Sequence, residues 1–263
     1  MRNFSFYSRN SMAFNNHKPQ KQGAHGVARV ISKRGYCSRS QAEKLVREGH
    51  VVLRGKPVRD PEFSAYENDE ILIDGTPVTA SKFVYFAMNK PRGIVTTASD
   101  EKGRKTVMDL FREEYGRMYP SKPMPHIAPV GRLDAASEGL LLFTNDTAWA
   151  DRVLTDATHL KIYRVQIKGK PTAAELSLME SGFNVPPRVF GEKEEFMHTK
   201  RAILYSEGEK NCWLEITLSE GKNREIRRML AHLGYEVLRL MRIQFDKFKL
   251  DDLKPGKIRA IQV

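Results

Sequence analysis

Apolar positions in the first third of the chain follow two helical patterns and then several short runs. The spacing predicts one helix near residues 27–35 and a second that begins at Ser38 or Ser40 and ends at Gly49. Three short runs between residues 51 and 75, separated by glycine-containing turns, predict strands. The pattern therefore predicts a small α/β module over residues 27–75, with a linker at 76–82 after it.

The pattern changes from residue 82 to the end of the chain at 263. Alternating apolar residues predict half-buried strands, for example over 161–168, and the continuous run at 140–143 predicts a strand buried on both faces. Asp146 is expected to cap a helix bearing Trp149, Val153 and Leu154. Runs of strands with occasional helices are typical of an α+β domain built on a mixed, largely antiparallel sheet.

Composition changes this picture at the N-terminus. Residues 1–26 contain basic residues and no acidic ones, and they are poor in apolar side chains, so we expect a disordered basic tail there. A short mitochondrial presequence is a weaker alternative, because the arginines show no sustained amphipathic pattern. The isolated cysteines Cys37 and Cys212 indicate a reducing compartment, and we expect a cytoplasmic protein, with an organellar location left open.

Charge points to a polyanionic partner. The chain of 263 residues has a formal net charge of +12, and lysines or arginines placed on phosphates release condensed counterions. A basic surface without any special partner is the alternative on charge alone. No apolar run is long enough to span a bilayer, so no membrane association is expected.

Basic residues are concentrated on the two predicted N-terminal helices. Six lysines and arginines lie between Arg29 and Arg47, against the single acid Glu43. A solvated helix pair would show the same charge run. However, the stretches 31–43 and 49–58 resemble the small RNA-binding module named after ribosomal protein S-four. The resemblance implies contacts to RNA phosphates from four residues: Ser38, Arg39, Lys44 and Arg47.

One loop in the larger part carries candidate chemistry. Gly131-Arg132-Leu133-Asp134 is followed by Ser137, Glu138 and the apolar run that begins at Gly139. On its residues alone, this segment could equally be a plain connector in which Arg132 and Glu138 form a surface ion pair.

The loop resembles the catalytic motif of the RsuA/RluB/RluE/RluF family of ribosomal RNA pseudouridine synthases. Further stretches agree with the family in the same order along the chain: Asn89-Lys90-Pro91, Lys161-Ile162-Tyr163, residues 220–229 and residues 253–259. With the N-terminal module, the resemblance covers about residues 27–263. The chain departs from the family at Ala135 and Ala136, where polar residues are more usual, and at Glu225, where glutamine is usual.

The resemblance implies an enzyme in which Asp134 is the catalytic carboxylate. It attacks the ribose as a nucleophile or removes a sugar proton as a base, and the sequence does not decide between these roles. A fixed cation favours an ionised carboxylate, and the resemblance assigns this cation to Arg227. Tyr163 would pack on the uracil ring, although an ordinary core aromatic is equally compatible with the pattern. Pseudouridine formation involves no redox change and loses no atom, so we expect neither a cofactor nor a metal.

The remaining site residues are expected to bind the substrate. Arg132 would hold the flipped-out nucleotide, since a guanidinium is planar, charged and able to stack. Leu238 or Leu240 would line the uracil pocket, and we favour Leu238. Basic residues in and after the 220–229 motif would contact phosphates: Lys222, Arg224, Arg228, Arg239 and Arg242.

Two other functions fit parts of the sequence. A non-catalytic RNA-binding assembly factor would need the basic surface and the module, but binding alone requires none of Asp134, Tyr163 and Arg227. A synthase acting on transfer RNA would share the short Arg-Leu-Asp core. We expect a monomer that acts on ribosomal RNA or on a pre-ribosomal particle; the sequence does not identify the uridine or the subunit.

Overall fold

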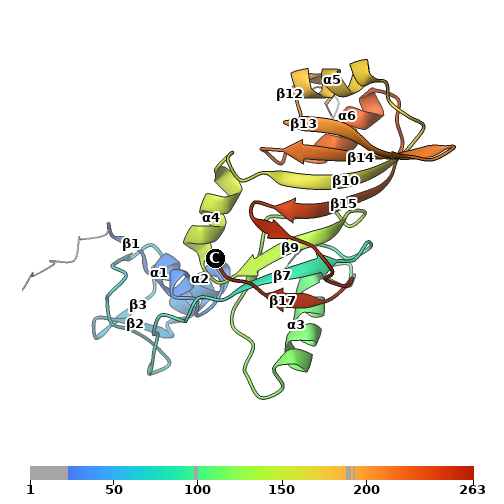
Figure 1. Cartoon of the computed structure of the whole chain (residues 1–263). Coiled ribbons are helices and arrows are strands. Elements are labelled where there is room, and N and C mark those ends of the chain that lie inside the picture. Colours follow the sequence, from blue (N-terminus) through green and yellow to red (C-terminus); the bar gives the residue numbers. More distant parts are fainter. Residues whose placement is uncertain (1–22, 98–99, 188–190, 192) are drawn as a thin grey trace, which may run out of the picture.

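The computed structural model describes residues 23–97, 100–187, 191 and 193–263. A small N-terminal module lies at one end of a larger domain, next to helix α4 (Thr147–Thr155), as Figure 1 shows. The expected basic tail lies outside the described residues as far as residue 22. The elements of the module are β1 (His25–Gly26), α1 (Val27–Lys33), α2 (Arg39–Glu48), β2 (Val51–Leu53), β3 (Lys56–Val58), β4 (Ser64–Ala65), β5 (Ile71–Ile73) and β6 (Thr76–Pro77).

Local signals explain the two helices of the module. Ser38 caps α2, because its hydroxyl accepts a hydrogen bond from the Gln41 amide while the Gln41 side chain accepts one from the Ser38 amide. Gly49 ends this helix in the left-handed conformation. Buried residues of both helices pack together with those of β2 and β5, so the predicted α/β module is confirmed.

Both ends of the module differ from the expected boundaries. His25–Gly26, expected in the tail, pairs with β4, and Thr76–Pro77, expected in the linker, pairs with β5. Val78 is buried in the core of the module. These short segments carry no strand pattern of their own. They are extended because each pairs with a neighbouring strand.

The larger domain is built on a nine-stranded sheet, in which the neighbours β9 and β15 are parallel and the other paired strands are antiparallel. The expected α+β fold on a mixed, largely antiparallel sheet is confirmed. Four elements of this domain precede α4: β7 (Tyr85–Lys90), α3 (Val107–Met118), β8 (Ala128–Val130) and β9 (Glu138–Thr144). The elements that follow α4 are β10 (Lys161–Lys168), α5 (Ala173–Ser181), β11 (Phe183–Val185), β12 (Glu195–Met197), β13 (Arg201–Glu207), β14 (Asn211–Leu218), α6 (Glu225–His232), β15 (Val237–Phe245), β16 (Phe248–Lys249) and β17 (Ile258–Ala260).

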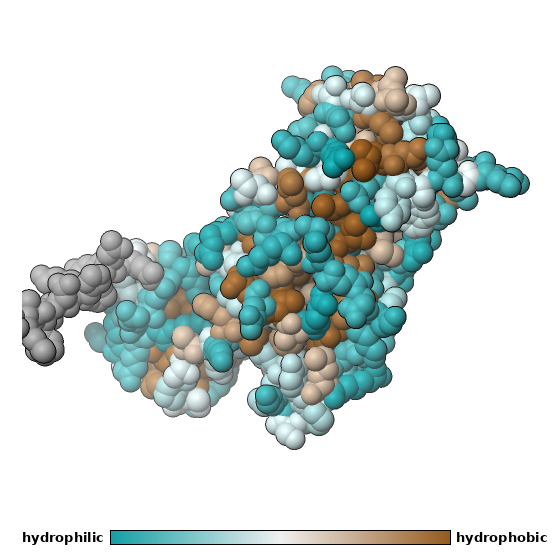
Figure 2. All heavy atoms as spheres, viewed as in Figure 1, coloured by the Kyte–Doolittle hydropathy of each residue, from teal (hydrophilic) through white to brown (hydrophobic). Residues whose placement is uncertain are grey.

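The two faces of the sheet have separate cores. Helices α3, α5 and α6 contribute to the larger core on one face, and α4 contributes to the smaller core on the other. Strand β9 serves both, since Leu141 and Phe143 point into the first and Leu140 and Leu142 into the second. This double burial explains the continuous apolar run in the sequence. In Figure 2, apolar side chains lie along the middle of the visible face of the larger domain, with hydrophilic side chains on both sides.

The predicted helix after Asp146 is α4, and its last turn differs in burial from the turns before it. Asp146 caps it as expected, accepting a hydrogen bond from the Trp149 amide, and Trp149 and Val153 are buried. Leu154 in the last turn is exposed and lies against Gly131. Its apolar side chain borders a cavity.

Gly139 lets strands β9 and β15 approach closely. Its φ is +101°, and a Cβ atom there would lie 2.3 Å from the carbonyl oxygen of Arg242, which is paired with it. Only glycine accommodates both the backbone conformation and this contact. The close approach places β15 beside the loop over residues 131–137, which precedes β9.

Asn145 holds the end of the linker against the larger domain. Its side-chain oxygen accepts a hydrogen bond from the Val84 amide at 2.9 Å, and its nitrogen donates to the Lys82 carbonyl at 3.1 Å. The Ser81 amide in turn donates to the Arg34 carbonyl of the module at 2.8 Å.

No helix in the described part of the chain is long and apolar enough to cross a membrane.

Candidate active site

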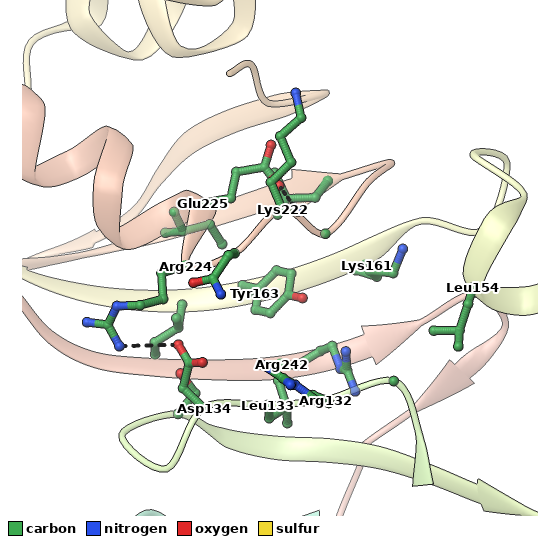
Figure 3. Close-up of a pocket in the computed structure, with 17 residues that line it drawn as sticks. Arg132, Leu133, Asp134, Leu154, Lys161, Tyr163, Lys222, Arg224, Glu225 and Arg242 are labelled. Carbon is green, nitrogen blue, oxygen red and sulfur yellow. Dashed lines mark hydrogen bonds and ion pairs between the residues drawn. The ribbon is translucent and has the colours of Figure 1, made fainter. Parts of the chain in front are cut away.

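An open cavity of about 410 Å³ lies where the 131–137 loop meets β10, β15 and the start of α6 (Figure 3). Its size is typical of a small-molecule or nucleotide pocket. The lining residues are Gly131, Arg132, Leu133, Asp134, Ser137, Leu154, Lys161, Tyr163, Leu218, Gly221, Lys222, Asn223, Arg224, Glu225, Ile226, Leu240 and Arg242.

Asp134 projects from the loop into this cavity. Its side chain is about one-third exposed, and one carboxylate oxygen lies 3.4 Å from Nη1 of Arg224. The backbone around it is held in a tight turn, in which the Ser137 amide donates to the Asp134 carbonyl at 2.9 Å. Asp134 is therefore a partly shielded carboxylate with a cation at its side.

Lys90 at the end of β7 anchors the 131–137 loop through hydrogen bonds to its backbone. Its ammonium group is fully buried and donates to three carbonyl oxygens, those of Pro91 at 3.0 Å, Asp134 at 3.1 Å and Ser137 at 2.7 Å. Burial lowers the pKa of Lys90 to about 8, while Asp134 and Glu138 oppose the shift. Each of the three protons of the charged form has an acceptor. This role was not predicted, although the Asn-Lys-Pro motif marked the position.

Tyr163 faces Asp134 across the cavity, as Figure 3 shows. It is buried on β10, where inward-facing residues alternate as predicted. Leu240 of the neighbouring strand lines the same cavity. Leu238, the leucine favoured from the sequence, is not among the lining residues. It stands near the start of β15, where the pairing with β10 shifts register, so alternation alone does not place it.

The cation beside Asp134 differs from the expected one. Arg224, at the N-terminus of α6, makes the ion pair, whereas Arg227 donates to the Ala136 carbonyl at 3.0 Å and lies 3.5 Å from the Ser137 hydroxyl. Burial and Arg224 lower the pKa of Arg227, and Asp134 raises it, so Asp134 and Arg227 remain electrostatically coupled. Arg227 thus holds the loop, and Arg224 contacts the carboxylate.

Of the other residues expected to bind the substrate, Arg132 and Lys222 line the cavity and Arg228 does not. Arg132 is exposed at the cavity and Lys222 lines it, with its Nζ donating to the Phe196 carbonyl at 2.8 Å. Arg228 points away, because its guanidinium pairs with Glu195 at 2.6 Å and donates to the Pro186 carbonyl at 3.1 Å. The structure therefore gives Arg228 a role in holding β12 against α6.

Comparison with known proteins agrees with this geometry. Residues 84–232 match the family described as RNA pseudouridylate synthase, and residues 27–71 match the S4 domain. The chain belongs to the RNA pseudouridylate synthase family. The match includes Asp134, Tyr163 and Arg227 within its bounds.

Several relatives of this synthase span nearly its whole length. It is 33% identical over 237 residues to the ribosomal large subunit pseudouridine synthase B of Bacillus subtilis (strain 168), covering 89% of this chain and 91% of that one. It is 35% identical over 243 residues to an uncharacterised RNA pseudouridine synthase of Rickettsia conorii (strain ATCC VR-613 / Malish 7), covering 90% and 96%. A crystal structure of a pseudouridylate synthase matches with 27% identity and a TM-score of 0.58, covering 90% and 96%.

The sequence did not place two charged lining residues of the synthase in the catalytic cavity: Lys161 had no assigned role, and Arg242 was expected among the phosphate contacts. Lys161 and Arg242 are buried, yet both carry a charge and border the cavity. A signal was present for Lys161, because it has the same inward parity on β10 as Tyr163 and Val165. A lysine at an inward-facing strand position is unusual unless it has a function or a partner.

The four module residues have different surroundings. The Ser38 hydroxyl caps α2, which gives this residue a structural role. Arg39, Lys44 and Arg47 have exposed side chains and lie near Glu43, Glu48 or Glu62. Such exposed ion pairs are weak, so these cations stay available to a phosphate.

Among the residues that the structure describes, no group of three or more His, Cys, Asp or Glu side chains could hold a metal ion.

Proposed function

We propose that this synthase isomerises a uridine of ribosomal RNA to pseudouridine, with Asp134 as its catalytic carboxylate. One observation carries the proposal: Asp134 and Tyr163 face each other in a cavity large enough for one base, with Arg224 beside the carboxylate. The ribosomal target rests on the Bacillus relative, whose name assigns it to the large ribosomal subunit and which matches most of this chain.

The arrangement suits a flipped-out nucleotide. The uracil ring would stack on Tyr163, which places the ribose near Asp134. Either mechanism for Asp134 begins there: attack on C1′ as a nucleophile, or removal of a sugar proton as a base. The base then leaves, turns and rejoins through C5, so every atom of the substrate is retained and no oxidant or reductant is required.

Cations around the mouth of the cavity and on the module would hold the RNA strand. Arg132 and Lys222 border the cavity, where a phosphate can stay partly hydrated, and Arg39 and Arg47 extend the basic surface on the module. We further propose that the enzyme is a monomer, as expected from the sequence.

A transfer RNA target and a purely structural role in ribosome assembly are the rival functions. Mapping pseudouridines in both ribosomal RNAs and in transfer RNAs, with and without the protein, separates them. Loss of one or a few pseudouridines in ribosomal RNA, restored by the wild-type protein and not by Asp134→Asn, is the expected result. A change confined to transfer RNA, or no change in any RNA, would contradict the proposal.

A further inference from the structure

Two buried cations form one wall of the cavity. Lys161 on β10 and Arg242 on β15 are 5% and 3% exposed, and both lie over the ring of Phe245, at 5.2 Å and 4.9 Å from its centroid. In Figure 3 they lie on the opposite side of Tyr163 from Asp134 and Arg224. We refer to Lys161 and Arg242 together as the cationic wall.

The hydrogen-bonding capacity of this wall is only partly used. Nε of Arg242 donates to the Leu140 carbonyl at 2.8 Å, but its Nη2 is buried without a partner among the described residues. Neither Lys161 nor Arg242 forms a salt bridge within the described part of the chain. Buried charges are normally paired, and both residues line the cavity, so the lack of an anionic partner in the described part of the chain indicates a site for an acceptor that a ligand would supply.

The electrostatics of the wall also favour an anion. Burial lowers the pKa of Lys161, and the neighbouring Arg242 lowers it further. Glu225, an acid that opposes this shift, is itself buried, and burial raises its pKa. A negative charge placed between the two cations would therefore relieve their repulsion.

The position of the wall identifies which part of the substrate it meets. Phosphates belong to the RNA strand and would remain at the mouth of the cavity, which the exposed Arg132 and the half-buried Lys222 line. The base is the part of a flipped nucleotide that enters most deeply. If its ribose is at Asp134 and its ring on Tyr163, the carbonyl edge of the uracil points toward Lys161 and Arg242.

We propose that Lys161 and Arg242 bind a carbonyl oxygen of the target uracil and stabilise the negative charge of the base after it has left the ribose. This inference rests on the proposed function. When the C1′–N1 bond breaks, its electron pair stays on N1, and the charge spreads by resonance onto O2 and O4. Asp134 meanwhile bonds to C1′ or takes the sugar proton. When C5 forms the new bond to C1′, the negative charge passes to Asp134, which either leaves C1′ as a carboxylate or returns its proton to the sugar. The proton on C5 is then lost and N1 takes up a proton, which gives neutral pseudouridine.

Preorganised donors that meet a developing charge in a water-poor site contribute mainly to the chemical step. Lys161→Met removes the charge at similar length. We expect the single-turnover rate at saturating RNA to fall by roughly 100-fold, while the dissociation constant for RNA changes by less than about threefold. The matched control is Lys168→Met, at the exposed end of the same strand, which should leave both values near those of the wild type.

A second substrate distinguishes charge stabilisation from a packing effect. Fluorine at C5 withdraws electrons and makes the detached base a more stable anion, so RNA with 5-fluorouridine at the target depends less on the wall. The defect of Lys161→Met in consuming the target nucleotide should therefore shrink by roughly tenfold on this RNA, which a merely misfolded cavity would not produce.

Two outcomes would overturn the inference. Equal defects on the two RNAs would show that Lys161 does not meet charge on the base. Weaker RNA binding with an unchanged rate at saturation would show that the wall holds a phosphate instead. Failure of the proposed function is separately visible, because wild-type protein would then convert no uridine in ribosomal RNA.

Discussion

Raising the pH through the titration of Lys90 should weaken catalysis while the protein remains folded. The ammonium form has three protons for the carbonyls of Pro91, Asp134 and Ser137. Since the pKa of Lys90 is lowered to about 8, the neutral amine dominates above that pH and can serve only two of the three. The loop that carries Asp134 should then lose part of its anchoring.

Stability should move in the opposite direction. Between about pH 8 and 10.5, the unfolded chain keeps a proton on Lys90 that the folded chain has lost. The contribution of this group to the unfolding free energy therefore rises with pH across this window, by up to about 3 kcal/mol. Activity lost through Lys90 is consequently not accompanied by unfolding at this site.

Single-turnover rates between pH 6.5 and 9.5 test this reasoning, with thermal unfolding measured in the same buffers. We expect the wild-type rate to decline above about pH 8. Lys90→Met should lack this decline and should be slower at neutral pH by roughly 10- to 100-fold, since small displacements of a reacting group are costly. The control Lys254→Met, at an exposed position, should keep the wild-type profile. A wild-type rate that is flat to pH 9.5, or an identical decline in Lys90→Met, would refute the argument.

Three further outcomes are expected. Gly139→Ala should lower the free energy of unfolding by at least about 3 kcal/mol, because its Cβ would collide with a strand backbone. At Gly103 a Cβ meets no atom within 4 Å, so Gly103→Ala should lower the free energy of unfolding by only about 1–2 kcal/mol. Denaturant unfolding measures both values. Arg224→Met should slow turnover without lowering the melting temperature, while Arg227→Met should lower both; equal melting losses would contradict the separate roles. Replacing the Arg39 side chain by Gln should reduce the slope of log affinity against log salt by about one unit, and an unchanged slope would show that this side chain does not face RNA.

Local signals in the sequence account for most of the fold. The caps at Ser38 and Asp146 act within three or four residues, and the alternation along β10 directly reflects one buried face. The edge strands β1 and β6 could not be predicted in this way. Each of these strands has only two residues, which is too short to show a periodic pattern. Their extended conformation depends on pairing with a strand elsewhere in the sequence.

The candidate site was predictable in its main residues and less so in their contacts. The motifs brought attention to Asp134 and Tyr163, and the structure places both in one cavity. The choice between Arg224 and Arg227 depends on how α6 is oriented against the loop, which a sequence does not encode locally. The same holds for the choice between Leu238 and Leu240, because the register shift between β10 and β15 falls at Leu238.

Substitution of Asp134 by Asn tests the central claim most directly. The change removes the charge at nearly constant shape, so RNA binding and the unfolding temperature should stay close to those of the wild type. Conversion of uridine to pseudouridine in a ribosomal RNA substrate, measured under single-turnover conditions, should fall by at least about 1,000-fold. A variant that folds, binds RNA and retains more than about a tenth of the wild-type rate would show that Asp134 is not the catalytic carboxylate.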